Sequence, residues 1–386
     1  MRDDYTKPSC VFGNTTMIIV AFLTAASYIG GLIGVDAIVS FSFILSIGIV
    51  LGLSIADIMI RTKLDPWLLI VLFFMVLAVI YSGIVMDFDY YKGFLITLCT
   101  FVCISYAPKL RVNEKTRKVI RYTFLAVALV TLVMFYLLGY KTKYFESTEA
   151  IAFNFSNPNA AGLWVTGVLL INSCFLFEQK RFLKITYYLV IAGLLHVIFS
   201  TESRNSLFAA VAFLTFLVLY RLGKNKKTPK VVLFVAVVAP IIIFFVYMYA
   251  ILPIASQVEG VLGMDKGVDT REMIWQSVLD KANEFMPLGR YDLYHGENLH
   301  NSLLTLLGTY GLPLMLSACW LMYRSAVMIQ ENISSLAAMA FCSIMLSGCF
   351  EASIFVGIGG FYLAVLVITA CFSNSDAFNM YQGNER

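Results

Sequence analysis

Long unbroken runs of apolar residues alternate along this chain with short polar segments. A helix that crosses the hydrocarbon core of a bilayer needs about 20 apolar residues, whereas a barrel strand shows about 10 residues in apolar–polar alternation. The runs at 231–251 and 352–372 are continuous and of the helical length. The pattern therefore predicts membrane-spanning helices and not a β-barrel.

The apolar runs predict an all-α polytopic membrane protein of about twelve spans, in which residues 1–386 form a single integral membrane domain. The predicted spans are 15–34, 37–57, 67–86, 93–108, 119–139, 161–177, 185–200, 206–221, 231–251, 302–323, 333–350 and 352–372. Several are short, which allows tilt or partial re-entry. No cleavable signal peptide is expected, because the first ten residues are polar and the first apolar run is long enough to span.

Lysine and arginine residues are distributed unevenly between alternate loops. With the N-terminus in the cytoplasm, 20 of the 28 fall in cytoplasmic segments and 8 in outer segments. An excess of positive charge in cytoplasmic loops is the normal pattern of multi-pass proteins. The distribution predicts that both termini are cytoplasmic.

Composition excludes the other broad classes of protein. Hydrophobic residues make up 60% of the chain and charged residues 13%, against about 45–50% and about 25% in soluble domains. The net charge of +4 comes from short cytoplasmic loops and not from a basic patch with interleaved aromatic residues, so a nucleic-acid partner is not expected. The eight cysteines lie mostly in apolar runs without C-x-x-C pairs, which indicates buried small side chains rather than a disulfide framework or a zinc site.

Two outer loops are longer than the others, one at 140–160 and the largest at 252–300. Loops of this length in a compact protein tend to be functional. In the large loop, Asp269 followed three positions later by Glu272 is typical of a helix start. Apolar residues then recur at helical spacing over 274–285, which predicts an amphipathic helix lying on the membrane or over a cavity.

Three polar residues are candidates for chemistry, and a fourth, His196, is better explained by packing. Arg271 falls in the first turn of the loop helix, where it suits an anion such as a phosphate or pairs with Asp269. Arg204 lies in a very short outer turn, where it acts in the site or extends to lipid headgroups. His300 lies at the outer mouth of the tenth span and is able to take a proton near neutral pH. His196 lies within an apolar run, which favours a hydrogen-bonded packing role.

One of these residues opens a recognisable motif. His300-Asn301, then nine residues, then Gly311 resembles the signature of the O-antigen ligase and O-antigen polymerase superfamily. Further matches to that family are Ser203-Arg204-Asn205 at an outer turn, Thr270-Arg271 followed by Trp275 at the loop-helix start, and Pro287-Leu288-Gly289 before the histidine.

The resemblance implies a GT-C-type glycosyltransferase of the bacterial cytoplasmic (inner) membrane, with its active site on the extracytoplasmic face. Such enzymes transfer saccharide from undecaprenyl diphosphate to an acceptor hydroxyl. Arg204 and Arg271 are then expected to hold the diphosphate, with His300 as the general base. Asn301 is expected to orient the base or a sugar, and the residues expected to contact saccharide are Arg290, Tyr294 and Asn298. No cofactor is expected, because the two arginines are able to stabilise the charge of the diphosphate without a metal ion.

The acceptor distinguishes two forms of this activity. A polymerase uses another lipid-linked repeat unit and often works with a chain-length regulator protein, whereas a ligase uses the lipid A core or a protein. We expect the polymerase, because such chains occur in many capsule and exopolysaccharide systems. A flippase or exporter of lipid-linked saccharide is a third hypothesis, but it predicts charged residues along a cavity within the spans, and few lie there. A purely structural subunit would leave the histidine motif without a role.

Overall fold

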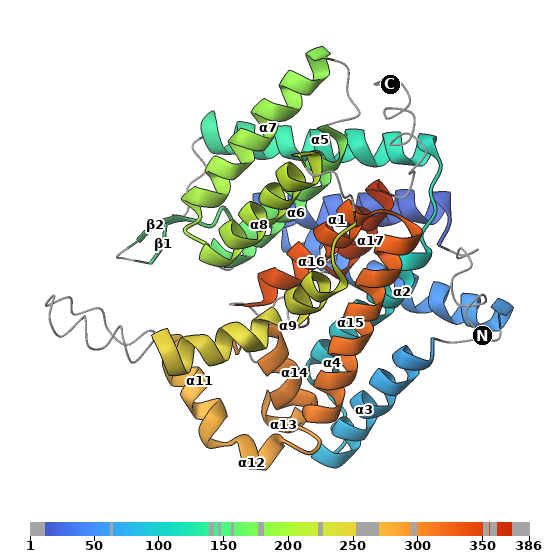
Figure 1. Cartoon of the computed structure of the whole chain (residues 1–386), viewed down its shortest axis with the longest axis vertical. Helices are drawn as coiled ribbons and strands as arrows, with labels where there is room; N and C mark the ends of the chain where they lie inside the picture. Colours follow the sequence, from blue (N-terminus) through green and yellow to red (C-terminus); the bar gives the residue numbers. More distant parts are fainter. Residues whose placement is uncertain are drawn as a thin grey trace, which may run out of the picture.

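The protein is represented by a computed structural model in which nearly all regular secondary structure is helical (Figure 1). It describes residues 12–61, 65–138, 143–145, 148–155, 158–176, 181–222, 227–251, 270–294, 299–349, 355 and 361–372. Within these residues the departure from helix is a small antiparallel hairpin in the loop predicted at 140–160. Its strands are β1 (Lys143–Phe145) and β2 (Thr148–Ile151).

Seven described helices are long and apolar enough to cross a bilayer. They are α1 (Asn14–Ile33), α2 (Asp36–Arg61), α4 (Phe88–Tyr106), α5 (Glu114–Tyr136), α7 (Arg181–Ser200), α9 (Lys230–Val246) and α15 (Leu312–Asn332). Shorter apolar helices are α3 (Pro66–Ser82), α8 (Arg204–Leu222) and α16 (Ser335–Leu346). By length and composition the chain is a multi-pass helical membrane protein.

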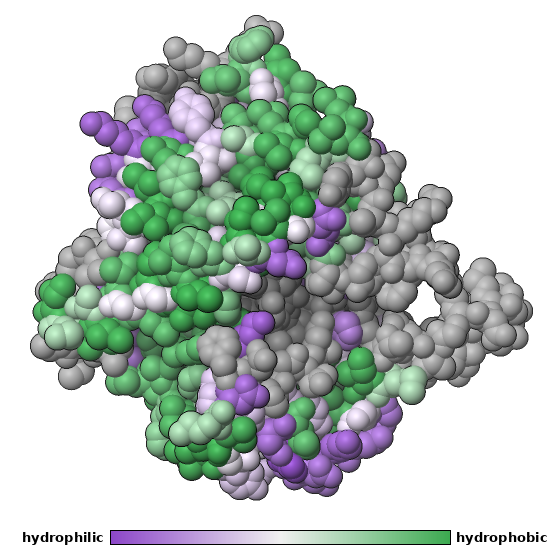
Figure 2. Space-filling model, turned by 180° about the vertical axis from the view of Figure 1, so that it is seen from behind, coloured by the Kyte–Doolittle hydropathy of each residue, from purple (hydrophilic) through white to green (hydrophobic). Residues whose placement is uncertain are grey.

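The centre of the bundle is formed by α16 together with α6 (Pro158–Phe175) and α17 (Phe361–Cys371). Nearly all their described side chains are buried, and α17 packs against α1, α4, α6 and α16. Helices that are apolar on all sides suit such a position. The outer helices α2, α3 and α7 instead expose large apolar side chains such as Met59, Phe73 and Phe182, and apolar residues cover much of the described surface in Figure 2. Lipid is the solvent that matches this surface.

The prediction of one continuous span at 302–323 was wrong. The structure has two helices there, α14 (Ser302–Tyr310) and α15, which meet at Gly311. Gly311 has a φ of +86°, and a Cβ at this position would lie 2.7 Å from backbone atoms of Leu288. Pro313 in the first turn of α15 then starts the new helix without needing a backbone N–H partner. Close packing against the large outer loop therefore breaks an apolar run that looks continuous in the sequence.

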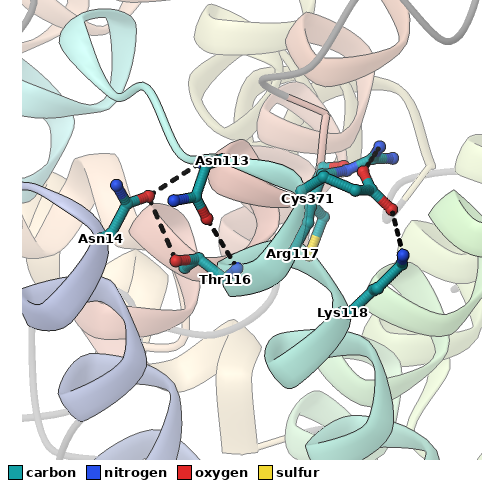
Figure 3. Close-up of polar contacts among 7 residues, drawn as sticks. Asn14, Asn113, Thr116, Arg117, Lys118 and Cys371 are labelled. Atoms are coloured by element: carbon teal, nitrogen blue, oxygen red, sulfur yellow. Dashed lines mark hydrogen bonds and ion pairs between the residues drawn. The ribbon is translucent and has the colours of Figure 1, made fainter.

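Polar contacts tie together helix ends that are far apart in the sequence (Figure 3). The side-chain oxygen of Asn14, at the start of α1, accepts hydrogen bonds from the backbone nitrogen of Asn113 at 2.8 Å and the Thr116 hydroxyl at 3.1 Å. The buried Arg117 on α5 donates from Nε to the carbonyl oxygen of Cys371, the last residue of α17, at 2.7 Å. The starts of α1 and α5 therefore meet the end of α17.

Two further contacts join helix ends in the same way. Nη1 of Arg324 on α15 lies 2.6 and 2.7 Å from the two carboxylate oxygens of Asp65, the residue that caps α3. Nη2 of Arg111 donates to the carbonyl oxygen of Asn332, the last residue of α15, at 3.0 Å. All of these ends are ones that the sequence predicts to be cytoplasmic.

Candidate functional site

Three residues other than glycine have a left-handed backbone conformation in the described part of the chain. They are Phe153 (φ +51°), Glu202 (φ +53°) and His300 (φ +52°). This conformation is disfavoured for residues with a Cβ, and it persists only where surrounding structure holds the backbone in place. All three lie in segments predicted for the outer face. Glu202 lies just before α8 and His300 just before α14.

The turn before α8 is packed closely against α6. The Ser203 hydroxyl accepts from the backbone nitrogen of Ser206 at 3.4 Å and lies 2.8 Å from the Ser206 hydroxyl. A Cβ added at Gly162 on α6 would lie 2.6 Å from that hydroxyl oxygen and 2.7 Å from the Ser203 Cβ. Arg204, the first residue of α8, remains exposed. An accessible guanidinium at the positive end of a helix is suited to an anion.

Asn301 holds the start of α14 through both ends of its amide. Its oxygen accepts from the backbone nitrogens of Leu303 and Leu304, each at 3.1 Å, which caps the helix. Its nitrogen donates to the carbonyl oxygens of Pro240 on α9 at 2.8 Å and of Cys349 at 3.1 Å. The side chain is completely buried. Its hydrogen-bonding capacity is therefore used within the protein, which favours a role in orienting the neighbouring histidine over direct contact with a sugar.

The starts of α8 and α14 meet at one short turn, η4 (Ser347–Cys349). Asn205 donates from Nδ2 to the Ser347 carbonyl oxygen, and Asn301 donates from Nδ2 to the Cys349 carbonyl oxygen. Each of these asparagines directly follows a candidate residue, an arginine in the first case and a histidine in the second. The structure therefore brings the segments that carry Arg204 and His300 to the same turn, η4.

The large-loop helix α11 (Thr270–Asp280) is linked to the same place from the other side of His300. Nε1 of Trp275 donates to the carbonyl oxygen of Leu299 at 2.8 Å. Arg271 lies one turn before Trp275 on this helix. His300 is partly exposed with its Nδ1 atom buried, and its backbone is flanked by two hydrogen-bonded neighbours. The helix predicted in the loop is present but shorter than expected: α11 ends at Asp280, and a separate short helix, α12 (Ala282–Phe285), follows. Two apolar residues of α11, Trp275 and Val278, pack on protein.

The three remaining predicted residues have different surroundings. The Arg290 guanidinium forms two hydrogen bonds with Asp292, at 2.9 and 3.0 Å, and these bonds lower the pKa of the Asp292 carboxyl. The half-buried Tyr294 lies beside α14 at Gly308, and burial raises the pKa of its phenol. Asn298 lies outside the described residues. Saccharide contacts by these residues stay predictions.

Sequence reasoning named Asn205 and Trp275 as motif matches but missed their hydrogen bonds, and it missed the turn η4. The repeated pattern of a candidate residue followed by asparagine, Arg204-Asn205 and His300-Asn301, is the one signal that was present. Nothing marks η4, because it lies at the end of an apolar run. The hydrogen bond expected for His196 is confirmed, since its Nδ1 is bonded to the Tyr136 hydroxyl, but the residue is exposed on α7 and not buried in the core.

Chemically, the arrangement combines an exposed guanidinium and an imidazole whose segments meet at η4 with a second arginine-bearing helix bonded to the residue before the histidine. Such a set is able to hold an anionic group and to accept a proton from a nearby hydroxyl. Comparison of the chain with protein-family models, with curated proteins and with solved structures gives no match.

Proposed function

We propose that the protein is a GT-C-type membrane glycosyltransferase that joins undecaprenyl-diphosphate-linked repeat units into a surface polysaccharide such as O-antigen, capsule or exopolysaccharide. The observation that carries this proposal is a series of hydrogen bonds that connects α8, η4, the start of α14 and α11. These bonds connect the segments of chain that carry Arg204, Arg271 and His300. The resemblance of the histidine motif supplies the substrate class.

The proposed topology has twelve spans with both termini in the cytoplasm and the site at the outer leaflet. It is supported by which helix ends touch. Ends predicted to be cytoplasmic contact one another, and so do ends predicted to be outer. The cytoplasmic pairs are Asn14 with Asn113, Asp65 with Arg324 and Arg111 with Asn332, and the outer pairs are Ser82 with Tyr291 and Asn205 with Ser347.

In the proposed reaction the bond between the donor's anomeric carbon and the diphosphate oxygen breaks, and the acceptor hydroxyl oxygen bonds to that carbon. Undecaprenyl diphosphate leaves with the bonding electron pair, so negative charge grows on it. Arg204 and Arg271 are assigned to this charge, because a guanidinium binds two phosphate oxygens at once and supplies fixed positive charge without a metal ion. His300 accepts the proton of the acceptor hydroxyl as general base.

The other residues have supporting roles in this proposal. Asn301 holds the histidine turn and does not touch sugar, because its amide is already bonded on four sides. Arg290, Tyr294 and Asn298 contact saccharide at the mouth of the site, with Arg290 acting together with Asp292. The polyprenyl tail lies along the lipid-exposed apolar helices, and a chain-length regulator is a partner in the same membrane.

The experiment is glycan transfer by the purified protein in detergent, supplied with undecaprenyl-diphosphate-linked repeat units and EDTA. Products are separated on a gel. Wild type is expected to produce a ladder that His300→Ala abolishes. His196→Ala is the matched control, because that histidine lies on α7 against Tyr136 and is assigned no chemistry; its ladder is expected to remain.

Other outcomes contradict separate parts of the proposal. Transfer only to lipid A core would identify a ligase and reject the polymerase. An unchanged ladder from His300→Ala would reject the histidine as general base. No transfer to either acceptor by folded wild-type protein would reject the glycosyltransferase itself.

A further inference from the structure

The helix α11 is attached to the body of the protein through a small apolar cluster separate from the main core. The buried members of the cluster are Phe244, Met248, Trp275, Val278, Leu299 and Leu304. Trp275 and Val278 are the two buried residues among the described side chains of α11. The Trp275 ring is 1% exposed and lies 5.4 Å from the rings of both Phe244 and Tyr247, nearly perpendicular to each. Trp275 is therefore the main anchor of this helix.

The same side chain also restrains the histidine turn. Its indole Nε1–H donates to the carbonyl oxygen of Leu299 at 2.8 Å in a buried environment. Leu299 is the residue before His300, whose φ of +52° has to be held by its surroundings. Loss of the donor to a buried carbonyl oxygen destabilises the folded state, because water does not reach that oxygen to replace the hydrogen bond. Docking of α11 and the conformation of His300 therefore depend on one tryptophan.

We propose that Trp275 is a positioning residue that couples the docking of α11 to the conformation of the His300 turn. With α11 docked, the Arg271-bearing helix and the histidine are in place together; without it, both are released. The kinetic consequence of this coupling rests on the proposed function, whereas the coupling itself is a property of the fold. It makes assembly of the general base conditional on the large outer loop.

The test uses Trp275→Phe, which keeps an aromatic ring in the cluster and removes the indole N–H. Val278→Ala is the matched control, because it trims the same cluster and leaves the hydrogen bond to Leu299 intact. Hydrogen–deuterium exchange is measured on the full-length protein in detergent for peptides covering 299–304. We expect exchange about tenfold faster in Trp275→Phe, as for the loss of one buried hydrogen bond, and near wild type in Val278→Ala.

Transfer kinetics provide the second measurement on the same variants. Trp275→Phe is expected to lower kcat about tenfold and to leave KM for the lipid-linked substrate nearly unchanged. Unchanged exchange in Trp275→Phe, or equal acceleration in both variants, would overturn the coupling whatever the activity. Absence of transfer by wild type would instead remove the proposed function, and the exchange result would still decide the coupling.

Discussion

Asn205 and Asn301 donate their side-chain amides to the same three-residue turn, at the carbonyl oxygens of Ser347 and Cys349. The two asparagines are 2% and 0% exposed, so water does not replace a lost bond. Each follows a candidate catalytic residue directly in the sequence. The turn η4 therefore acts as a common support that sets how the arginine on α8 and the histidine before α14 lie relative to one another.

Replacing Asn301 by aspartate separates its capping role from its donor role. The carboxylate of Asn301→Asp still accepts from Leu303 and Leu304, but it has no N–H for the carbonyl oxygens of Pro240 and Cys349. We expect a loss of about 2 kcal/mol or more, because two buried acceptors lose a donor and a charge is placed beside them. Thermal unfolding in detergent measures this loss.

The matched control is Asn113→Asp, which caps α5 through its side-chain oxygen at the exposed helix end. Its effect is expected to stay within about 0.5 kcal/mol. Equal losses in the two variants would show that the amide donor of Asn301 contributes nothing.

Because both asparagines act on η4, their alanine variants are expected to be coupled. Asn205→Ala and Asn301→Ala should each destabilise by about 1–3 kcal/mol, and the double variant should lose less than the sum, with a coupling energy above about 0.5 kcal/mol. A double-mutant cycle from thermal unfolding measures the coupling. Asn205→Ala combined with Asn113→Ala is the control pair and should be additive; additivity in both pairs would argue against a shared support.

The break between α14 and α15 should be intolerant of a side chain. Gly311→Ala places a Cβ at a φ of +86° and 2.7 Å from backbone atoms of Leu288, so we expect a loss of more than about 1 kcal/mol. Gly48→Ala on α2 meets nothing within 4 Å and should be neutral or slightly stabilising. Unfolding temperatures of the two variants test this contrast, which a neutral Gly311→Ala would contradict.

The Arg290–Asp292 pair should give a small acid-dependent contribution to stability. The pKa of the folded Asp292 carboxyl is lowered by its hydrogen bonds with Arg290, so its stabilisation is present above the unfolded pKa of about 3.9. That stabilisation is lost as the pH falls through the lowered pKa of the folded state. Both side chains are about a third exposed, which keeps the effect small. Unfolding of wild type and Asp292→Asn should differ at pH 7 and converge in strong acid; a constant difference would refute the pairing.

Arg117 should matter for stability far more than the lysine beside it (Figure 3). Its guanidinium is buried, bonds the Cys371 carbonyl oxygen and lies 5.4 Å from the ring of Phe175. Arg117→Lys loses the planar donor and is expected to destabilise by about 1–3 kcal/mol. Lys118→Ala removes an exposed side chain 3.9 Å from Glu114 and should change stability by less than about 0.5 kcal/mol. Similar unfolding curves for both variants would contradict the structural role of Arg117.

The sequence predicted helices well wherever the reason for a helix was local. A long apolar run has to satisfy its own backbone in lipid, so spans such as 15–34 and 119–139 correspond to α1 and α5 with small shifts at the ends. The hydrogen bond of His196 followed from the same reasoning, because a lone imidazole in an apolar run needs a hydrogen-bonded neighbour. The outer position of the candidate residues rests on loop charge and span length and stays a prediction.

The tertiary structure decided what depends on distant segments. The apolar run at 302–323 breaks because the large loop packs against Gly311, and that contact is invisible in the run itself. Asn301 was predicted to orient a base or a sugar, and only the carbonyl oxygens of Pro240 and Cys349 favour the first role. In the sequence, Trp275 is one apolar position of an amphipathic helix. Its indole hydrogen bond is decided by the tertiary structure, because it depends on where Leu299 lies.

The sequence by itself determined that this is a helical membrane protein with its polar candidates between spans, because bilayer thickness, backbone hydrogen bonding and loop charge act on short stretches of chain. The tertiary structure alone decided that the segments bearing Arg204 and His300 meet at η4, and that the helix bearing Arg271 is bonded to the residue before His300. The links are hydrogen bonds from side chains to backbone carbonyl groups, and such groups are the same in every residue. Their pairing is therefore set by folding and leaves almost no trace in residue identity.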